Sequence, residues 1–223
     1  RESVQEGTDH YDFMTTFEGL SGALENADLS IVTLETLAAG REKGYGNYNT
    51  TPQILDALRA VGVNFVSLAT ERALDKGYDG LDITASELTS RSIGFAGVYP
   101  DGTNTGAAMA NIDGVQVAVL AYTYGLSDEG RERTRDDSRG VVAMMDSQRV
   151  VRDITQARVD GANIVVVLPH WGTKNRAQTP DTVQTMAREM AQAGADVIFG
   201  THPNVAQGIE RLQTVRSDGL TYE

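Results

Sequence analysis

Residues 147–173 read SQRVVRDITQARVDGANIVVVLPHWGT, and this stretch decides the fold class. Within residues 147–160, the apolar side chains from Val150 to Ala157 recur at helical spacing, which predicts an amphipathic helix. Residues 163–168 are almost continuously apolar, as is typical of a strand covered on both faces of its sheet. A helix that leads directly into a buried strand indicates an α/β fold.

The same alternation extends in both directions along the chain. Further short apolar strands are expected at residues 29–34, 63–68, 93–98 and 196–199. Further helices are expected at residues 12–26 and 81–91, and after the Thr-Pro pairs at 51–52 and 179–180, where a cap residue precedes a proline suited to the first helical turn. The pattern therefore predicts several strand–helix units in succession.

Three other segments complete the expected architecture. Residues 107–122 contain Asp113-Gly114 between two apolar runs, which predicts a β-hairpin, and residues 208–223 predict a second hairpin around 217–219. Residues 127–139 are charged and have no apolar face, so a surface loop is expected there. Together the elements predict a layered α/β sandwich, with mixed sheets flanked by helices.

Composition limits the classes of function. The 223 residues suit one domain over residues 1–223, and the absence of cysteine excludes disulfides and thiolate metal sites. Lys and Arg number 19 against 31 Asp and Glu, a net charge of −12, which disfavours binding to nucleic acid. An acidic chain can still hold an anionic ligand through a local basic cluster. Because the sequence begins with Arg1, we expect it to be truncated.

Polar residues follow four of the predicted strands, at the edge where α/β folds gather their ligands. The four segments are residues 33–35, 69–75, 169–172 and 200–204. Two of the three histidines, His170 and His202, lie among them. One histidine at a strand end is commonly a structural hydrogen-bonding group, but two at equivalent ends favour a site. With Glu35 they would form a three-ligand set for zinc or manganese, leaving one position open for water.

Charged residues near these ends have two interpretations. Glu71 and Arg72 could form an ordinary salt bridge, or could belong to the site. Lys174 and Arg176 form a local basic patch after His170, and either solvated loop charges or an anion-binding role would explain them.

Five segments in this order resemble the CapA-type poly-γ-glutamate capsule biosynthesis family. They are ADLSIVTLET (27–36), VNFVSLATERALDKGYDG (63–80), VAVLAYTYG (117–125), LPHWGT (168–173) and AGADVIFGTHPNVAQGIE (193–210). The resemblance implies a calcineurin-like metallophosphoesterase fold. It also implies that a strand ending in Gly-Asp before Arg1 and a Ser-Leu-Gly-Asn-Phe strand after Glu223 are missing, so truncation at both ends is expected.

The resemblance carries over to individual positions. The sequence retains three of the family's site residues, Glu35, His170 and His202. The resemblance therefore implies catalytic roles for His170 and Glu35, and a manganese or zinc site formed by all three. Four family motifs differ in this sequence. The family's Asn-Leu-Glu is Thr-Leu-Glu at 33–35, and its Asn-Asn-His is Thr-Glu-Arg at 70–72. Its Gly-His-His-Pro-His is Gly-Thr-His-Pro-Asn at 200–204, and the Glu that the family has close after His-Trp-Gly is replaced here by Thr173 and Lys174.

The substituted positions change the expected ligand. A guanidinium cannot ligate a metal and carries a fixed positive charge, so Arg72 could hold a carboxylate or phosphate directly. The expected substrate-binding residues are Arg72, Thr70, Lys174 and Asn204.

Three functions follow in order of preference. The first is an exported protein, at the cell surface or membrane-anchored through a segment absent from this chain, that is weakly catalytic or non-catalytic. It would handle an anionic polymer such as poly-γ-glutamate alongside other membrane proteins of capsule synthesis. The second is a metal-dependent hydrolase of a phosphoester or γ-glutamyl amide, and the third is a protein-binding module.

Overall fold

The chain forms two compact units in the computed structural model, which describes residues 3–4, 11–24, 26–40, 48–103, 106–135, 141–215 and 221–222. The first unit comprises Arg1–Thr103 with Leu126–Val141, and the second comprises Asn104–Gly125 with Val142–Glu223. The expected single domain over residues 1–223 stays a prediction.

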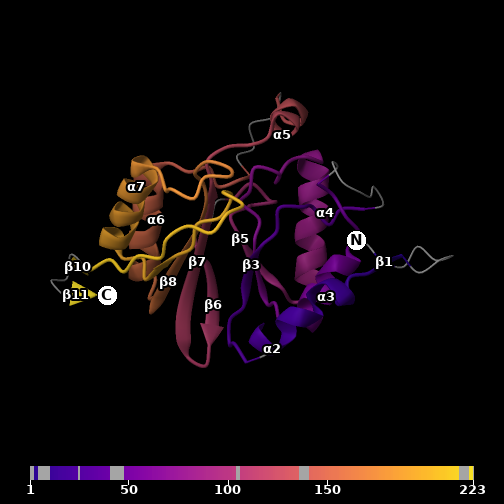
Figure 1. Cartoon of the computed structure of the whole chain (residues 1–223), viewed down its shortest axis with the longest axis horizontal. Helices are drawn as coiled ribbons and strands as arrows, with labels where there is room; N and C mark the ends of the chain where they lie inside the picture. The colour runs from indigo at the N-terminus through magenta and orange to yellow at the C-terminus, as the bar shows by residue number, and fades with distance from the viewer. Residues whose placement is uncertain are drawn as a thin grey trace. The chain divides into compact units, whose positions relative to one another are not determined.

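The first unit is built on a parallel sheet of three strands in the order β3 (Ile31–Thr33), β4 (Phe65–Ser67) and β5 (Gly94–Ala96). The helices α3 (Gln53–Ala60) and α4 (Gly77–Ser90) connect successive strands (Figure 1). Parallel neighbours need such crossovers, and these place the carboxyl ends of the strands at one edge.

Short elements complete the first unit. They are β1 (Ser3–Val4), β2 (Tyr11–Asp12), α1 (Met14–Phe17), the 3₁₀ helix η1 (Glu18–Leu20), α2 (Ser21–Leu24) and α5 (Asp128–Arg133).

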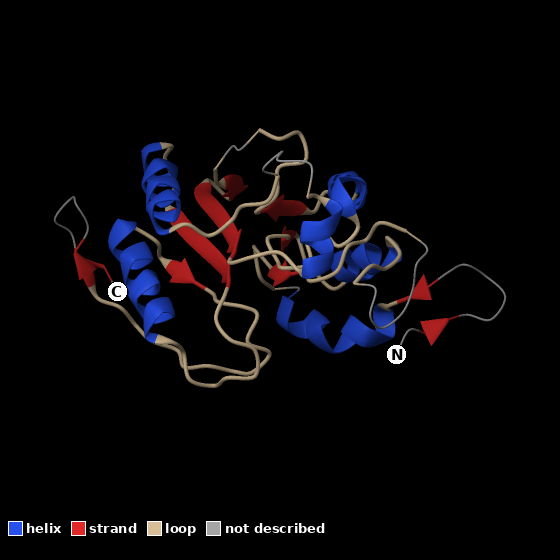
Figure 2. Cartoon of the chain, turned by 90° about the horizontal axis from the view of Figure 1, so that it is seen from above, coloured by secondary structure: helices blue, strands red, loops and turns tan. Residues whose placement is uncertain are grey.

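The second unit has a mixed sheet in the order β6 (Ala108–Ile112), β7 (Val115–Thr123), β8 (Ile164–His170) and β9 (Val197–Ile198). Strands β6 and β7 form an antiparallel hairpin, while β7, β8 and β9 run parallel. The helices α6 (Ser147–Val159) and α7 (Asp181–Ala193) lie side by side against the sheet (Figure 2). The short strands β10 (Thr214–Val215) and β11 (Thr221–Tyr222) pair antiparallel.

The central strand β8 and the helix α6 supply much of the core of the second unit. The side chains of Val165, Val167 and Ile154 are all 0% exposed. At the edge strand β9 burial is much weaker, since Val197 is 48% exposed and Phe199, which follows the strand, is 64% exposed. The sheet is therefore well packed at its centre and apolar but accessible at this edge.

The expected α/β fold with sheets flanked by helices is confirmed, as is the hairpin around Asp113-Gly114. The strands β10 and β11 match the second expected hairpin, while its turn at 217–219 lies outside the described residues.

Two expectations about helices need correction. The expected continuous helix over residues 12–26 is broken into α1, η1 and α2, a stretch that contains Gly19 and Gly22, and glycine favours the helical state poorly. The expected surface loop over residues 127–139 contains the helix α5. Ser127 caps that helix by accepting a hydrogen bond from the Gly130 N–H at 2.9 Å, and the sequence places acidic residues in its first turn and arginines in its last.

Candidate functional site

The two predicted histidines of the second unit lie in direct contact. His170 is the last residue of β8, and His202 lies in the loop that follows β9, so the parallel pairing of β8 with β9 brings their loops together. The His202 Nδ1 atom is 3.2 Å from the His170 Nε2 atom, and the ring planes meet nearly edge to face. His170 is 1% exposed and His202 is 5% exposed. The two strand ends thus bring these side chains together, while the predicted metal-binding role of both and the catalytic role of His170 stay predictions.

Two further side chains extend the contact into a line of four polar groups. The His170 Nδ1 atom is 3.0 Å from the Thr201 hydroxyl, and the His202 Nε2 atom is 3.4 Å from the Tyr124 hydroxyl. A neutral imidazole has one donor and one acceptor nitrogen, while a hydroxyl can serve as either. With both rings neutral, one consistent direction of donation from Tyr124 to Thr201 satisfies every hydrogen bond in the line.

The backbone around His202 is strained. Its φ of 97° lies in the left-handed region that favours glycine, and Asn204 in the same loop has a φ of 58°. The loop is held by hydrogen bonds from the Trp171 N–H to the Thr201 carbonyl at 3.1 Å and from the Thr201 N–H to the Pro169 carbonyl at 2.9 Å. Such strain persists where the surrounding structure enforces it, and it concentrates at functional sites.

The pair satisfies part of what a metal site requires. Two nitrogen ligands of a tetrahedral zinc ion, each about 2.0–2.1 Å from it, lie about 3.3 Å apart, close to the separation of these two imidazole nitrogens. The Thr201 hydroxyl on the far nitrogen of His170 resembles the outer contacts that orient metal-bound histidines. However, in the described parts of the chain no group of three or more His, Asp or Glu side chains is placed to hold an ion. Glu35 belongs to the first unit, so its place in a three-ligand set stays a prediction.

In the first unit, Arg72 and its neighbours form a compact charged cluster, called the Arg72 cluster below: Arg72, Glu71, Asp75, Ser127 and Tyr48. The guanidinium of Arg72 is 3.2 Å from the Asp75 carboxylate and 3.3 Å from the Glu71 carboxylate. It also lies over the ring of Tyr48, with its central carbon 3.8 Å from the ring centroid. The Ser127 hydroxyl donates a hydrogen bond to Asp75, which is 1% exposed.

This cluster explains the ionisation of Arg72. Burial disfavours the charged guanidinium, but the negative charges of Asp75 and Glu71 and the hydrogen bond to Asp75 outweigh that effect. The pKa of Arg72 is therefore raised above its ordinary value. The salt-bridge interpretation of Glu71 and Arg72 matches this geometry. The guanidinium of Arg72 thus forms ion pairs with two carboxylates of its own chain.

The other predicted site residues occupy varied surroundings. Thr70 is 1% exposed, and its hydroxyl accepts a hydrogen bond from the Arg72 N–H at 3.2 Å, so it shapes the loop after β4. Glu35 is half-buried in the segment after β3, while Lys174 and Asn204 are exposed in the loops that follow β8 and β9. Their expected substrate-binding roles stay predictions.

Sequence reasoning missed Tyr124 and Ser127, and it placed Asp75 in the strand-end segment 69–75 without giving it a role. Tyr124 directly follows β7, so the strand-end rule that selected His170 would also have selected it. Asp75 and Ser127 are 52 positions apart, and only the folded chain shows that they are hydrogen-bonded.

The chain matches, over residues 1–218, the family described as bacterial capsule synthesis protein PGA_cap. It belongs to this family. The PGA_cap chain is 28% identical over 163 residues to the PGA biosynthesis protein CapA of Bacillus subtilis strain 168, which covers 72% of the chain and 42% of that relative. It is 26% identical over 201 residues to the "probable polyglutamine synthesis accessory protein Rv0574c" of Mycobacterium tuberculosis, covering 84% of the chain and 53% of that relative.

The PGA_cap chain thus spans about two fifths to one half of the length of these relatives. Among solved structures it is similar to the calcineurin-like phosphoesterase YfkN from Bacillus subtilis, with a TM-score of 0.51 and 16% identity, covering 88% of this chain and 65% of that one. At this identity the likeness shows the fold alone. None of the helices in the described ranges has both the length and the hydrophobicity needed to cross a bilayer.

Proposed function

We propose that this PGA_cap chain is part of a bacterial surface protein that binds and guides an anionic polyglutamate chain during capsule synthesis, with little or no catalytic turnover. The observation that carries the proposal is the family match over residues 1–218, together with the names of its relatives, which refer to PGA biosynthesis and to polyglutamine synthesis. The hydrogen bonding of the two histidines with one another and with two hydroxyls supports a structural use of this pair.

The proposal includes a place in the cell. The protein would be exported and held at the cell surface through a segment outside this chain, next to the membrane proteins that make the polymer. The description of the family as bacterial capsule synthesis proteins supports a cell-surface role, as does the name of a further relative, the capsule biosynthesis protein CapA of Bacillus anthracis.

Binding to the polymer tests this function. We expect fluorescently labelled poly-γ-glutamate to bind the purified chain at moderate salt, and hyaluronate, a polyanion with a different backbone, to bind more weakly. Because the chain carries a net charge of −12, general attraction to polyanions is disfavoured, and binding must come from a local site. Absence of poly-γ-glutamate binding even at low salt would contradict the proposal.

A second candidate is a metal-dependent hydrolase of a phosphoester or γ-glutamyl amide, and the spacing of the histidine nitrogens supports it. His170 and His202 would hold the ion, with Glu35 as the third ligand or as a base. A divalent cation in such a site supplies a Lewis acid and lowers the pKa of bound water. The chain itself would orient His170 through the Thr201 hydroxyl and exclude bulk water from the buried rings.

Metal retention separates the two candidates. The chain would be incubated with manganese or zinc, freed of unbound metal and analysed by mass spectrometry, beside a His170→Ala/His202→Ala double variant and a His10→Ala control at the third histidine. The hydrolase candidate requires near-stoichiometric metal that only the double variant loses. Equal metal content in all three proteins would exclude a site at this pair.

A further inference from the structure

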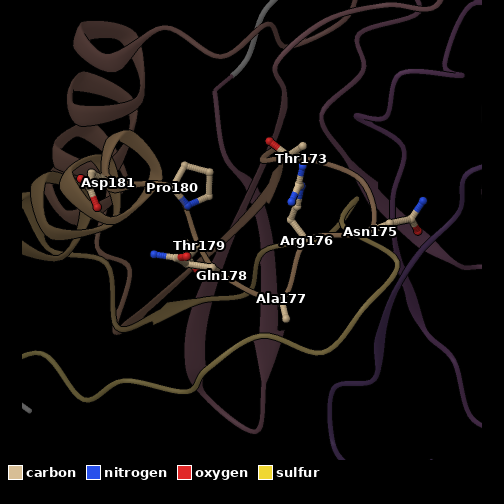
Figure 3. A pocket seen from close by; sticks show the side chains of 8 residues that line it. All are labelled: Thr173, Asn175, Arg176, Ala177, Gln178, Thr179, Pro180 and Asp181. Carbon is tan, nitrogen blue, oxygen red and sulfur yellow. The ribbon is translucent and has the colours of Figure 1, made fainter.

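A pocket of about 710 Å³ lies along the segment that joins β8 to α7. Figure 3 shows its lining side chains, which all come from residues 173–181, from the loop after His170 to the first turn of α7. The volume falls in the range of roughly 300–1,000 Å³ that accommodates small organic ligands. The pocket is thus large enough for a short oligomer, and it lies wholly within the second unit.

The loop that lines the pocket is held in place by hydrogen bonds to a second loop, the one that follows β9 and contains His202. The Asn175 N–H donates to the Pro203 carbonyl at 2.7 Å, and the Gln207 side-chain amide donates to the Arg176 carbonyl at 2.9 Å. The Thr179 hydroxyl also donates to the Gln207 side-chain oxygen at 3.3 Å. These contacts fix the backbone of the pocket, so ligand binding needs little ordering of the main chain and orders chiefly the exposed side chains such as that of Arg176.

The charge of the pocket comes chiefly from Arg176. Within the described residues, the guanidinium of Arg176 forms no ion pair with any carboxylate, in contrast to Arg72. The lining contains one acidic side chain, Asp181, at the far end of the segment. A planar guanidinium matches a carboxylate in geometry and charge, so Arg176 is suited to hold one.

The remaining polar lining groups suit an amide chain. Asn175 and Gln178 each offer a side-chain amide, which can both donate to and accept from a peptide group, and Thr173 and Thr179 add hydroxyls. A γ-linked glutamate polymer presents one amide and one carboxylate in every repeat. One cation surrounded by amides and hydroxyls therefore complements that repeat better than it complements a densely charged polyanion.

We propose that this pocket binds a segment of a γ-linked glutamate chain, with a carboxylate on Arg176 and a backbone amide at Gln178. The assignment rests on the proposed function and specifies where the polymer contacts the second unit. Lys174, exposed in the same loop, adds positive charge beside the pocket. Because the chain is acidic overall, such local charge is needed to admit an anionic ligand.

The test compares two single-charge variants by isothermal titration with a short γ-linked glutamate oligomer. Arg176→Gln removes the pocket cation, and Arg152→Gln removes an exposed arginine of α6 that forms no ion pair in the described structure. We expect roughly fivefold weaker binding for Arg176→Gln, as for a partly exposed ion pair, and less than about twofold for Arg152→Gln. An α-linked glutamate oligomer of equal charge should bind the wild-type chain more weakly, because its amides are spaced differently.

The outcomes separate this inference from the function on which it rests. If poly-γ-glutamate binds and Arg176→Gln binds it as tightly as the wild-type chain does, the pocket assignment is wrong and the proposed function stands. Equal weakening by Arg152→Gln would also overturn the assignment, because it would show attraction to charge alone. Equal affinity for the α-linked oligomer would overturn it too, because it would show that the pocket does not distinguish the γ linkage. If the wild-type chain binds no γ-linked glutamate, both proposals fail.

Discussion

Arg72 and Arg176 both lie in loops that follow a parallel strand, β4 in the first unit and β8 in the second, yet their surroundings differ. Arg72 is flanked by two carboxylates and covers the ring of Tyr48. Arg176 lines an open pocket and has no carboxylate partner in the described structure. The charge of Arg72 is therefore used within the fold, whereas that of Arg176 remains available to a ligand. An arginine at a strand end is thus informative only once its neighbours are known.

The largest expected effect comes from removing Asp75. Asp75→Ala leaves the partly buried Arg72 with Glu71 alone and deprives the Ser127 hydroxyl of its acceptor, so we expect a loss of about 3 kcal/mol in the free energy of unfolding. Urea denaturation measures it. Asp128→Ala, which removes a nearly fully exposed carboxylate, should cost less than about 0.5 kcal/mol. Equal effects of the two variants would show that the Arg72 cluster is no more important than a surface ion pair.

Removal of His170 should have the next largest effect. His170→Ala removes the hydrogen bonds of the buried His170 ring with the Thr201 hydroxyl and with His202, and we expect a loss of about 2 kcal/mol in the free energy of unfolding. Denaturation with and without manganese or zinc checks both the size and the cause. If manganese or zinc stabilised the wild-type chain far more than it stabilised the His170→Ala variant, the result would favour the hydrolase candidate instead.

The hydroxyl of Ser127 should contribute less. Ser127→Ala removes the cap of α5 and the hydrogen bond to Asp75, for an expected loss of about 1.5 kcal/mol. Ser127→Thr retains the hydroxyl and should stay within about 0.5 kcal/mol of the wild-type chain. If the two variants unfolded at the same urea concentration, the hydroxyl would have no role in attaching α5 to the Arg72 cluster.

The smallest expected effect concerns polymer binding by Arg72. Because its guanidinium already contacts Asp75 and Glu71, Arg72→Gln should weaken binding of a γ-linked glutamate oligomer less than about twofold while lowering stability. Titration of a folded sample, verified by circular dichroism, measures the affinity. A loss as large as that expected for Arg176→Gln would support the predicted role of Arg72 in substrate binding and remove the contrast between the two arginines.

Much of the fold was predictable because its strands are short apolar runs between recognisable helices. The run at 163–168 and the Asp113-Gly114 turn were both placed correctly. Errors arose where local signals were weak or mixed. The helical periodicity over residues 12–26 gave no sign of the 3₁₀ segment that contains Gly19. The high charge over residues 127–139 gave no sign of a six-residue helix, which is stabilised by its cap and end charges.

The candidate site was predictable in residue type but not in detail. Strand ends indicated that His170 and His202 would meet, because parallel strands bring such residues to one edge. The orientation of the rings depends on the left-handed backbone at His202, which no sequence pattern foretells for a histidine. The Glu71–Arg72 pair was among the predicted alternatives, because the two residues are adjacent in sequence. The contact of Tyr48 with Arg72 and that of Ser127 with Asp75 were not predictable, because these residues lie far apart in the chain.

The exposed edge at β9 has a consequence for handling the chain in solution. Among the described strands, β9 lies at the edge of its sheet, with Val197 in the strand and Phe199 just after it both accessible. An open strand edge beside apolar side chains is the combination through which β-proteins associate with one another. Concentrated samples should therefore show reversible self-association that depends on temperature more than on salt. The substitution Phe199→Lys would place a charge next to this edge and so oppose association between chains. It would keep the binding and denaturation experiments free of aggregation.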